Sequence, residues 1–437
     1  MSVHTHEIFT RKLWVLIKRS TAAYILLKLT LEPVYRAWRF VAGRLTCWMV
    51  SRPGLRERLY NPVQVMPIDE WLASKPMADH PRPLHVVDGF DFDPDPPLYL
   101  DATPRPELDA FRNLHAAPGR IVRLRRGRVQ GRDGATITAD GVMLFEASND
   151  VSFGPRNHRI FTRPLWHPPH RLAGRWAVAL GSWADNYYHW LYDIVPKLLL
   201  LKRVDPTFER CDGILVPTRR QAFQSDTLHC LGVPEDKLLE VGDDAFFEAD
   251  ELLVPICSGG FGARDHNTPP WLVEDLHRLM LPDGVATAAP AERVRIYITR
   301  GDAPTRGVVN EAEVVAFLRG YGFRTVRLAG MSLRDQARLF ASAEAIVTPH
   351  GAALANLIYC RSGTKIIECF SPLYTNFCYW PVSAGRGLVY GYVLGDGSRL
   401  PTWLPVHLGS VPIIIPLDKL RRMLVRMEIG PQVLQGG

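Results

Sequence analysis

A histidine and an aspartate four residues apart, His189 and Asp193, form a pair whose spacing could do chemistry. On a helix such residues lie on one face, and a carboxylate beside an imidazole fixes its tautomer and raises its basicity. A general base needs that arrangement. Asn186 lies near the expected N-terminus of the same helix. The alternative is that His189 is an ordinary hydrogen-bonding residue in an aromatic-rich core, and we favour catalysis or substrate binding.

A second group of candidates lies between Ser342 and Phe370, where an apolar strand, a small-residue turn, a helix and another strand follow one another. This order predicts one βαβ unit of a parallel sheet. His350 and Glu368 then fall at the ends of neighbouring strands, where open α/β sheets bind ligands. The backbone N–H groups of Gly351 and Ala352 lie at the expected N-terminus of the helix, where an anion can bind. The pattern indicates a nucleotide-diphosphate site, although Gly-Ala-Ala could also simply allow close packing.

Two arginines follow the strand expected at 294–299. Arg300 ends that strand and Arg306 lies in the next loop, so two guanidinium groups are available to bind a diphosphate. Asn310 and Glu311 come next, and we count both among the candidates for binding a nucleotide diphosphate. They also have a structural explanation, because Asn310 suits a helix N-cap and Glu311 suits the first helical turn.

An acidic stretch offers a different chemistry. Asp91, Asp93 and Asp95 follow a short apolar segment, and carboxylate oxygens at a strand end could hold a divalent metal against a diphosphate. The prolines around them are more typical of an acidic loop. We therefore expect no metal site and no cofactor, and keep a divalent metal bound by these aspartates as the alternative.

The composition is that of a soluble globular protein. With 437 residues, 47% hydrophobic and 22% charged, the chain predicts two domains and an appendage. A net charge of +7 suits an anionic ligand or membrane, and is too diffuse to indicate nucleic acid. The cysteines lack metal-ligand or disulfide spacing and indicate a reducing compartment, hence a cytoplasmic protein; they are residues 47, 211, 230, 257, 360, 369 and 378.

Residues 1–59 form a separate segment in which basic and apolar residues alternate. Basic side chains and interfacial aromatics over residues 8–52 favour a helix lying on an anionic membrane, that is, a peripheral membrane protein. The alternative is a helical hairpin packed on the body. Pro33 is expected to break the helix in two. The apolar run from Leu13 to Leu31 is interrupted by charges and is too polar to span a bilayer.

The rest of the chain reads as two α/β domains. Residues 60–285 predict an irregular connector, then β-hairpins, then alternating strands and helices, and form the expected N-terminal domain. The Pro/Ala-rich segment 282–292 is the expected linker. Residues 293–437 form the expected C-terminal domain, with strands at 294–299, 325–328 and 413–415 and helices at 311–319, 333–341 and 417–427.

Five motifs, in order along residues 176 to about 380, resemble those of glycosyltransferase family 61. The sequence carries Asn186 to Asp193 (N-Y-Y-H-W-L-Y-D), Tyr297 to Arg300 followed by Arg306 and Asn310-Glu311, Asp335-Gln336 with Leu339-Phe340, Pro349 to Asn356, and Gly363 to Phe370. The family includes bacterial polysaccharide-biosynthesis proteins, plant xylan-decorating transferases and animal enzymes that add N-acetylglucosamine to secreted domains. Residues 1–170 lie outside the resemblance.

The resemblance implies a GT-B-like fold, in which two Rossmann-like domains face a cleft and the C-terminal one holds the donor. It implies inverting, metal-independent transfer from a nucleotide sugar, for which we favour UDP, to a glycan or lipid-linked saccharide such as a capsule precursor. It places Arg300, Arg306, His350, Gly351 and Glu368 around the donor, with Glu368 on the ribose hydroxyls. His189, Asp193, Asn186 and Tyr188 fall on the acceptor side.

One departure leaves the catalytic base open, because no second acidic residue stands directly beside Asp193. The rival enzyme is a metal-dependent GT-A-type transferase that uses Asp91, Asp93 and Asp95. A non-enzyme alternative also stays open, namely an α/β protein that binds a glycan without turnover.

Overall fold

The computed structural model describes residues 21–56, 58–75, 82–100, 106–148, 158–162, 164–165, 167–257, 269–281, 293–301, 306–397 and 411–432. The chain divides into two compact units. The C-terminal unit comprises Met1–Tyr35, Pro94–Phe111 and Leu281–Gly437, and the central unit comprises Arg36–Asp93 and Arg112–Met280. The linker expected at 282–292 lies outside the described residues.

The C-terminal unit is built on a five-stranded sheet in which every pair is parallel. The strands lie in the order β14–β13–β15–β16–β17, and their bounds are β13 Val294–Ile298, β14 Phe323–Val326, β15 Ala343–Pro349, β16 Lys365–Phe370 and β17 Val389–Leu394. Numbered along the chain, this order is 2-1-3-4-5, a doubly wound arrangement whose switch point lies between the first and third strands. Here those strands are β13 and β15.

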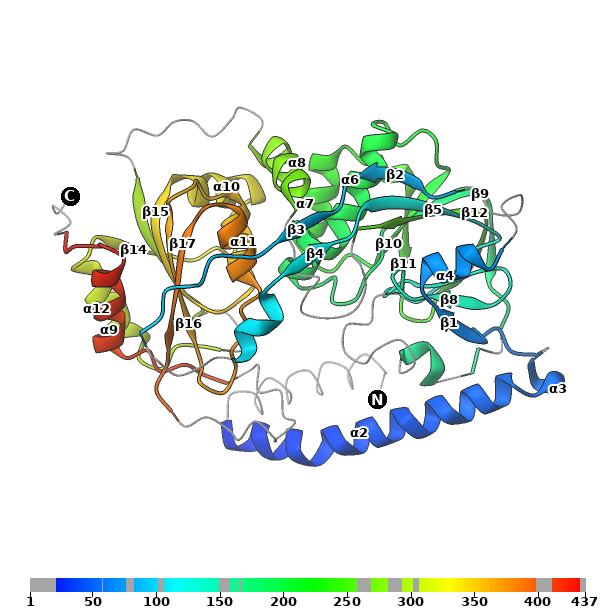
Figure 1. The fold of residues 1–437 in the computed structure, drawn as a ribbon, viewed down its shortest axis with the longest axis horizontal. Helices are drawn as coiled ribbons and strands as arrows, with labels where there is room; N and C mark the ends of the chain where they lie inside the picture. The colour runs from blue at the N-terminus through cyan, green and yellow to red at the C-terminus, as the bar shows by residue number, and fades with distance from the viewer. Residues whose placement is uncertain are drawn as a thin grey trace. The chain divides into compact units, whose positions relative to one another are not determined.

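Helices cover both faces of this sheet (Figure 1). Helices α9 (Glu311–Arg319) and α12 (Leu417–Arg426) share one apolar core with β13, β15 and β16. Helices α10 (Leu333–Ser342) and α11 (Tyr379–Gly385) lie on the other face, and both contact the 3₁₀ helix η8 (Ala352–Tyr359). Ser332 caps α10 by accepting a hydrogen bond from the Asp335 backbone N–H. The change of face between α9 and α10 creates the switch point.

The central unit contains a ten-stranded mixed sheet. Strands β9 (His170–Val178), β10 (Gly213–Pro217) and β11 (Leu238–Val241) pair in parallel, and β12 (Phe246–Ile256) joins β9 in parallel and β5 (Gly119–Arg125) antiparallel. The remaining strands are β1 (Gln64–Met66), β2 (Leu84–Val87), β6 (Arg128–Gln130), β7 (Ala135–Ile137) and β8 (Val142–Leu144). The predicted hairpins and the predicted α/β segment thus share one sheet.

The helical segment after β9 is less regular than expected. The sequence predicts one helix through His189 to Leu201, and the structure has α5 (Tyr187–His189), a π-helical turn (Trp190–Ile194) and then α6 (Val195–Val204). Helices α7 (Ala222–Leu231) and α8 (Pro270–Met280) complete the unit. A π turn widens one helical turn and is frequent at functional sites.

Helix α2 runs without interruption from Thr21 to Val50, and the expected break at Pro33 is wrong. A proline removes one backbone hydrogen bond, and the flanking turns carry the 30-residue helix past it. Within the described part of the chain, no helix is both long and apolar enough to cross a membrane.

Residues 60–110 also differ from the irregular connector that the sequence suggests. They contain β1, β2, helix α4 (Ile68–Ala73), strand β3 (Phe90–Phe92), which pairs with β4 (Leu114–Ala116), and most of a 3₁₀ segment over Pro106–Phe111. The short helix α3 (Pro53–Arg56) lies just before them. Within the C-terminal unit, Leu98 bridges to Gly391 of β17. Ile413 forms an isolated bridge with Val308, so the strand expected at 413–415 is not present.

Candidate functional site

The switch point of the C-terminal unit brings two predicted residues into contact. Arg300 follows β13, Gly351 follows β15, and β13 and β15 are hydrogen-bonded neighbours. A Cβ atom added to Gly351 would overlap Nη1 of Arg300 and come within 2.8 Å of its Cζ. The guanidinium therefore lies directly on the Gly351 backbone. A cation is thus placed where doubly wound sheets bind ligands.

Gly351 is required here by that contact and not by its backbone angles. Its φ of 173° is extended and open to any residue. The following helix is 3₁₀ and not the expected α-helix, although it begins at Ala352 as predicted. Gly351 and Ala352 therefore still lie at a helix start beside an arginine.

His350 is held by a chain of two hydrogen bonds. Its Nδ1 lies 2.5 Å from Oε1 of Glu368, and the Tyr390 hydroxyl donates to Oε2 of Glu368 at 2.5 Å. His350 is 5% exposed and Glu368 is 0% exposed. The imidazole also packs against the rings of Phe370 and Tyr379. The two strand-end residues predicted to lie together do so, and a tyrosine from β17 completes the chain.

This geometry changes the role we assign to Glu368. Both of its oxygens have protein partners and the side chain is fully buried, so it is placed to orient His350 and not to accept hydrogen bonds from a ribose. Burial raises the pKa of Glu368 to about 8, although the hydrogen bond from Tyr390 and the charge of Arg306 oppose the shift. Below that pH the carboxyl can donate to Nδ1, which leaves the His350 proton on Nε2.

The raised pKa predicts that the parent protein and the variant Glu368→Gln differ in how their stability depends on pH. Glutamine has the same shape as glutamate and stays neutral. A carboxyl whose pKa rises from 4.5 to about 8 on folding stabilises the protein fully below pH 4.5 and loses that contribution as pH rises through 8. The melting temperature of the parent should therefore fall relative to that of the variant between pH 5 and pH 8. If the melting temperatures of the two proteins change with pH in the same way, folding does not raise the pKa of Glu368.

Arg306 reaches the same region through Tyr374. Its Cζ lies 5.6 Å from the centre of the Tyr374 ring, and that ring lies 5.4 Å from the His350 ring. Arg306 has a φ of +59°, a conformation that non-glycine residues rarely adopt and that clusters at binding sites. Among the described residues, its buried Nε has no hydrogen-bond partner. Both features fit an arginine kept ready for an anion.

Asn310 and Glu311 have structural partners instead. The Asn310 amide pairs with the backbone of Ile415, donating to its carbonyl at 2.9 Å and accepting from its N–H at 3.0 Å. Asn310 occupies the N-cap position of α9, but its side chain makes no cap hydrogen bond. Oε1 of Glu311 accepts from Tyr297 and Thr299 at 3.0 and 2.7 Å. These contacts fix the loop after β13, and whether either residue also meets a donor stays a prediction.

In the central unit, the predicted His189–Asp193 pair forms. Nδ1 of His189 lies 2.8 Å from Oδ2 of Asp193, and the two side chains are 22% and 26% exposed. The pair bridges the π turn that follows α5. The Asn186 side chain caps α5 by accepting from the Tyr188 N–H at 2.9 Å, and Tyr188 is buried. With Asp193 on Nδ1, Nε2 of His189 remains to take a proton.

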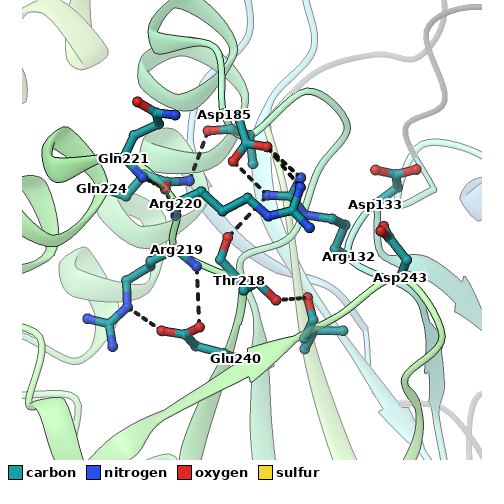
Figure 2. A network of polar contacts seen from close by, with 12 residues as sticks. Arg132, Asp133, Asp185, Thr218, Arg219, Arg220, Gln221, Gln224, Glu240 and Asp243 are labelled. Atoms are coloured by element: carbon teal, nitrogen blue, oxygen red, sulfur yellow. Dashed lines mark hydrogen bonds and ion pairs between the residues drawn. The ribbon is translucent and has the colours of Figure 1, made fainter. Parts of the chain in front are cut away.

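A polar network holds the loop that leads to His189 (Figure 2). Arg132, in the turn between β6 and β7, binds both oxygens of Asp185 at 2.8 and 2.9 Å and donates to the Thr218 carbonyl at 3.1 Å. The pair raises the pKa of Arg132 and lowers that of Asp185. The Gln224 amide donates to the Ala184 carbonyl at 3.0 Å. The loop is thus tied to the turn between β6 and β7 and to α7.

Lys197 secures the start of the same loop. It lies one helical turn beyond Asp193, is buried, and donates to the Leu180 carbonyl at 2.5 Å. Burial lowers its pKa, and the nearby Cys257 and Asp193 oppose the shift. His189, Asp193 and Lys197 are spaced four residues apart. The sequence analysis identified the first two and missed Lys197.

The aspartates of the acidic stretch have separate partners. Asp91 lies 2.5 Å from the His115 ring, and Asp93 lies 3.6 Å from Arg112. The Asp95 carbonyl accepts from the Trp380 indole at 2.7 Å. A search of the described ranges finds no group of three or more metal-ligating His, Cys, Asp or Glu side chains. The three aspartates therefore do not form one ligand set here.

Sequence reasoning missed several residues that support these clusters. Tyr374 and Tyr390 lie in segments without an evident motif, and only the parallel pairing of β16 and β17 brings Tyr390 beside Glu368. Arg132 and Asp185 are separated by 53 residues along the chain, so no local pattern links the two.

Comparison with known proteins supports the family resemblance that the motifs indicate. Residues 187–367 match the family Glycosyltransferase 61, a range that includes both the His189–Asp193 pair and the strands, loops and helices around Arg300 and His350. No curated protein matched the chain. The match begins one residue after Asn186 and ends at Ile367, one residue before Glu368. The match over residues 187–367 thus supports the assignment of this part of the chain to glycosyltransferase family 61, and with it a glycosyltransferase.

Proposed function

We propose that the protein transfers a sugar from a nucleotide sugar, most simply a UDP-sugar, to a saccharide acceptor with inversion and without a metal ion. The observation that carries the donor assignment is the contact of Arg300 with Gly351 at the switch point of the doubly wound sheet. Arg306, His350 and the backbone at Gly351–Ala352 add donors for a diphosphate.

The proposed reaction is one displacement. His189 takes the proton of the acceptor hydroxyl through Nε2, and the hydroxyl oxygen attacks the anomeric carbon of the donor. The bond from that carbon to the diphosphate oxygen breaks, and the bonding pair leaves with the nucleotide diphosphate. Arg300 and Arg306 stabilise the negative charge that develops on the leaving diphosphate. Such stabilisation is usually the largest single contribution to catalysis. Asp193 holds the His189 tautomer.

Thermal-shift measurements with UDP, GDP, CDP and dTDP test the donor assignment. A ligand present at a hundred times its dissociation constant stabilises the native state by about 2.7 kcal/mol. We expect UDP to raise the melting temperature of the parent protein and to do so less in Arg300→Ala. A protein that none of the four diphosphates stabilises would contradict the proposal.

The acceptor is proposed to be a glycan or a lipid-linked saccharide at the inner face of the cytoplasmic membrane, with residues 8–52 on the anionic surface. Exposed apolar side chains on α2 recur at steps of three and four residues and are 50% to 64% exposed: Leu31, Val34, Trp38, Val41, Leu45 and Trp48. Arg44 on α2 and Arg52 just after the helix suit anionic headgroups.

Removal of residues 1–52 tests the membrane proposal. The full-length protein should sediment with phosphatidylglycerol vesicles, and the shortened protein should stay in the supernatant with its α/β units folded. Binding should also weaken as salt rises, because each basic residue near the surface contributes about 1 kcal/mol of screened attraction. Full-length protein that remains in the supernatant at low salt would show that α2 does not bind membrane.

A further inference from the structure

Trp183 is an exposed tryptophan in an unfavourable backbone conformation. Its side chain is 59% exposed, and its φ is +62°, in the left-handed region that bulky residues avoid. Such conformations persist where the surrounding structure imposes them, and they cluster at binding sites. An exposed ring contributes little to a core, so the position calls for another explanation.

The loop around Trp183 is fixed on both sides. Lys197 binds the Leu180 carbonyl before it, and Gln224 and Arg132 bind Ala184 and Asp185 directly after it. Figure 2 shows Arg132 and Arg220 converging on Asp185. The Trp183 carbonyl itself accepts from the Asn186 N–H at 2.8 Å. The backbone that presents the indole is therefore held by contacts from several elements.

The indole is presented beside the proposed base. The centres of the Trp183 and His189 rings are 6.4 Å apart, and their planes differ by 31°. A group lying on the indole face would thus have its edge near the imidazole. Of the charged side chains in this region, Arg132 and Arg220 are engaged by Asp185, and Asp193 is engaged by His189. Trp183 is thus an exposed aromatic ring next to His189.

We infer that Trp183 is the stacking platform for the pyranose ring of the acceptor. A pyranose has an apolar C–H face, which packs on the electron-rich face of an indole, and a rim of hydroxyls. Stacking on Trp183 would direct one hydroxyl toward Nε2 of His189. This inference rests on the proposed function, because it assumes that His189 acts on a saccharide, and it adds that the acceptor sugar is recognised by its apolar face.

Saturation-transfer NMR tests the inference directly and needs no donor. The probes are the methyl β-glycosides of glucose, galactose, xylose and N-acetylglucosamine, with sorbitol as a polyol that has no ring face. At least one glycoside should receive saturation from the parent protein, strongest at the C–H protons of one face. Trp183→Ala should weaken its binding about tenfold, and Trp183→Phe should retain part of it.

Two control variants separate stacking from folding. Trp183→Asn tolerates a positive φ, so it should melt at or above the parent temperature while losing saturation transfer. Trp271→Ala removes a partly exposed tryptophan elsewhere in the central unit and should leave the transfer unchanged. Equal transfer in the parent and in Trp183→Ala would overturn the inference, as would a parent protein that binds none of the four glycosides.

The two proposals can fail separately. Glycoside binding that depends on Trp183, in a protein that binds no nucleotide diphosphate, would support the platform and remove the proposed transfer reaction. If nucleotide binding and sugar transfer are unchanged in Trp183→Ala, the proposed transfer reaction stands and Trp183 is not the stacking platform.

Discussion

Replacing His189 with alanine is expected to lower turnover by about 10²–10⁴-fold while the affinity for UDP stays nearly unchanged. The substitution removes the proposed base and leaves Arg300, Arg306 and His350 in place. The His189 side chain is 22% exposed, so we expect its loss to lower the melting temperature only modestly. Turnover, UDP affinity and melting temperature should be measured on one preparation.

Two further variants sharpen this result. Asp193→Asn keeps the imidazole and disturbs only its tautomer and orientation, so it should lose less activity than His189→Ala. His115 and Asp91 form a second His–Asp pair in the central unit, at 2.5 Å and with both side chains mostly exposed. His115→Ala is therefore the matched control and should retain full turnover. Near-normal turnover in His189→Ala, together with a lowered melting temperature, would make His189 a structural residue.

Gly351→Ala is expected to weaken UDP binding by about tenfold to a hundredfold. The new Cβ would overlap the Arg300 guanidinium, so Arg300 must leave its place at the switch point. A charge-assisted hydrogen bond to phosphate is worth about 1.5–3 kcal/mol, which sets the size of the loss. Titration calorimetry with UDP measures it.

Arg300→Ala should give a similar loss, and the double variant should lose little more than either single one, since both act on one guanidinium. Gly430→Ala is the control in the same unit, because a Cβ there has no atom within 4 Å. It should bind UDP like the parent. Unchanged UDP affinity in Gly351→Ala and Arg300→Ala would show that the Arg300 guanidinium does not hold the nucleotide.

Local patterns predicted the centre of the C-terminal sheet well. The βαβ unit over Ser342–Phe370 was expected from an apolar run, a small-residue turn and a second apolar run, and β15 and β16 pair there in parallel. His189 and Asp193 were expected to meet because four-residue spacing on a helix is a local property, and they do meet. Helix α9 has the predicted bounds because Glu311 and Arg319 suit its two ends.

Features that depend on distant segments could not be predicted in this way. The Arg132–Asp185 pair joins a β-turn to a loop that lies 53 residues further along the chain, and Tyr390 meets Glu368 only through strand pairing. The π turn at Trp190–Ile194 leaves no periodic signal in five residues. Trp183 is a non-glycine residue at positive φ, and nothing in its own sequence neighbourhood marks that conformation.

The most direct test of the central claim is the release of UDP from UDP-sugars in the presence of a saccharide acceptor and EDTA. If the protein is a metal-independent nucleotide-sugar transferase, the parent should release UDP at the same rate with and without EDTA, and His189→Ala should release it at least about a hundredfold more slowly. Release that EDTA abolishes would favour the metal-dependent alternative. Release that is equal in the parent and in His189→Ala would contradict the account.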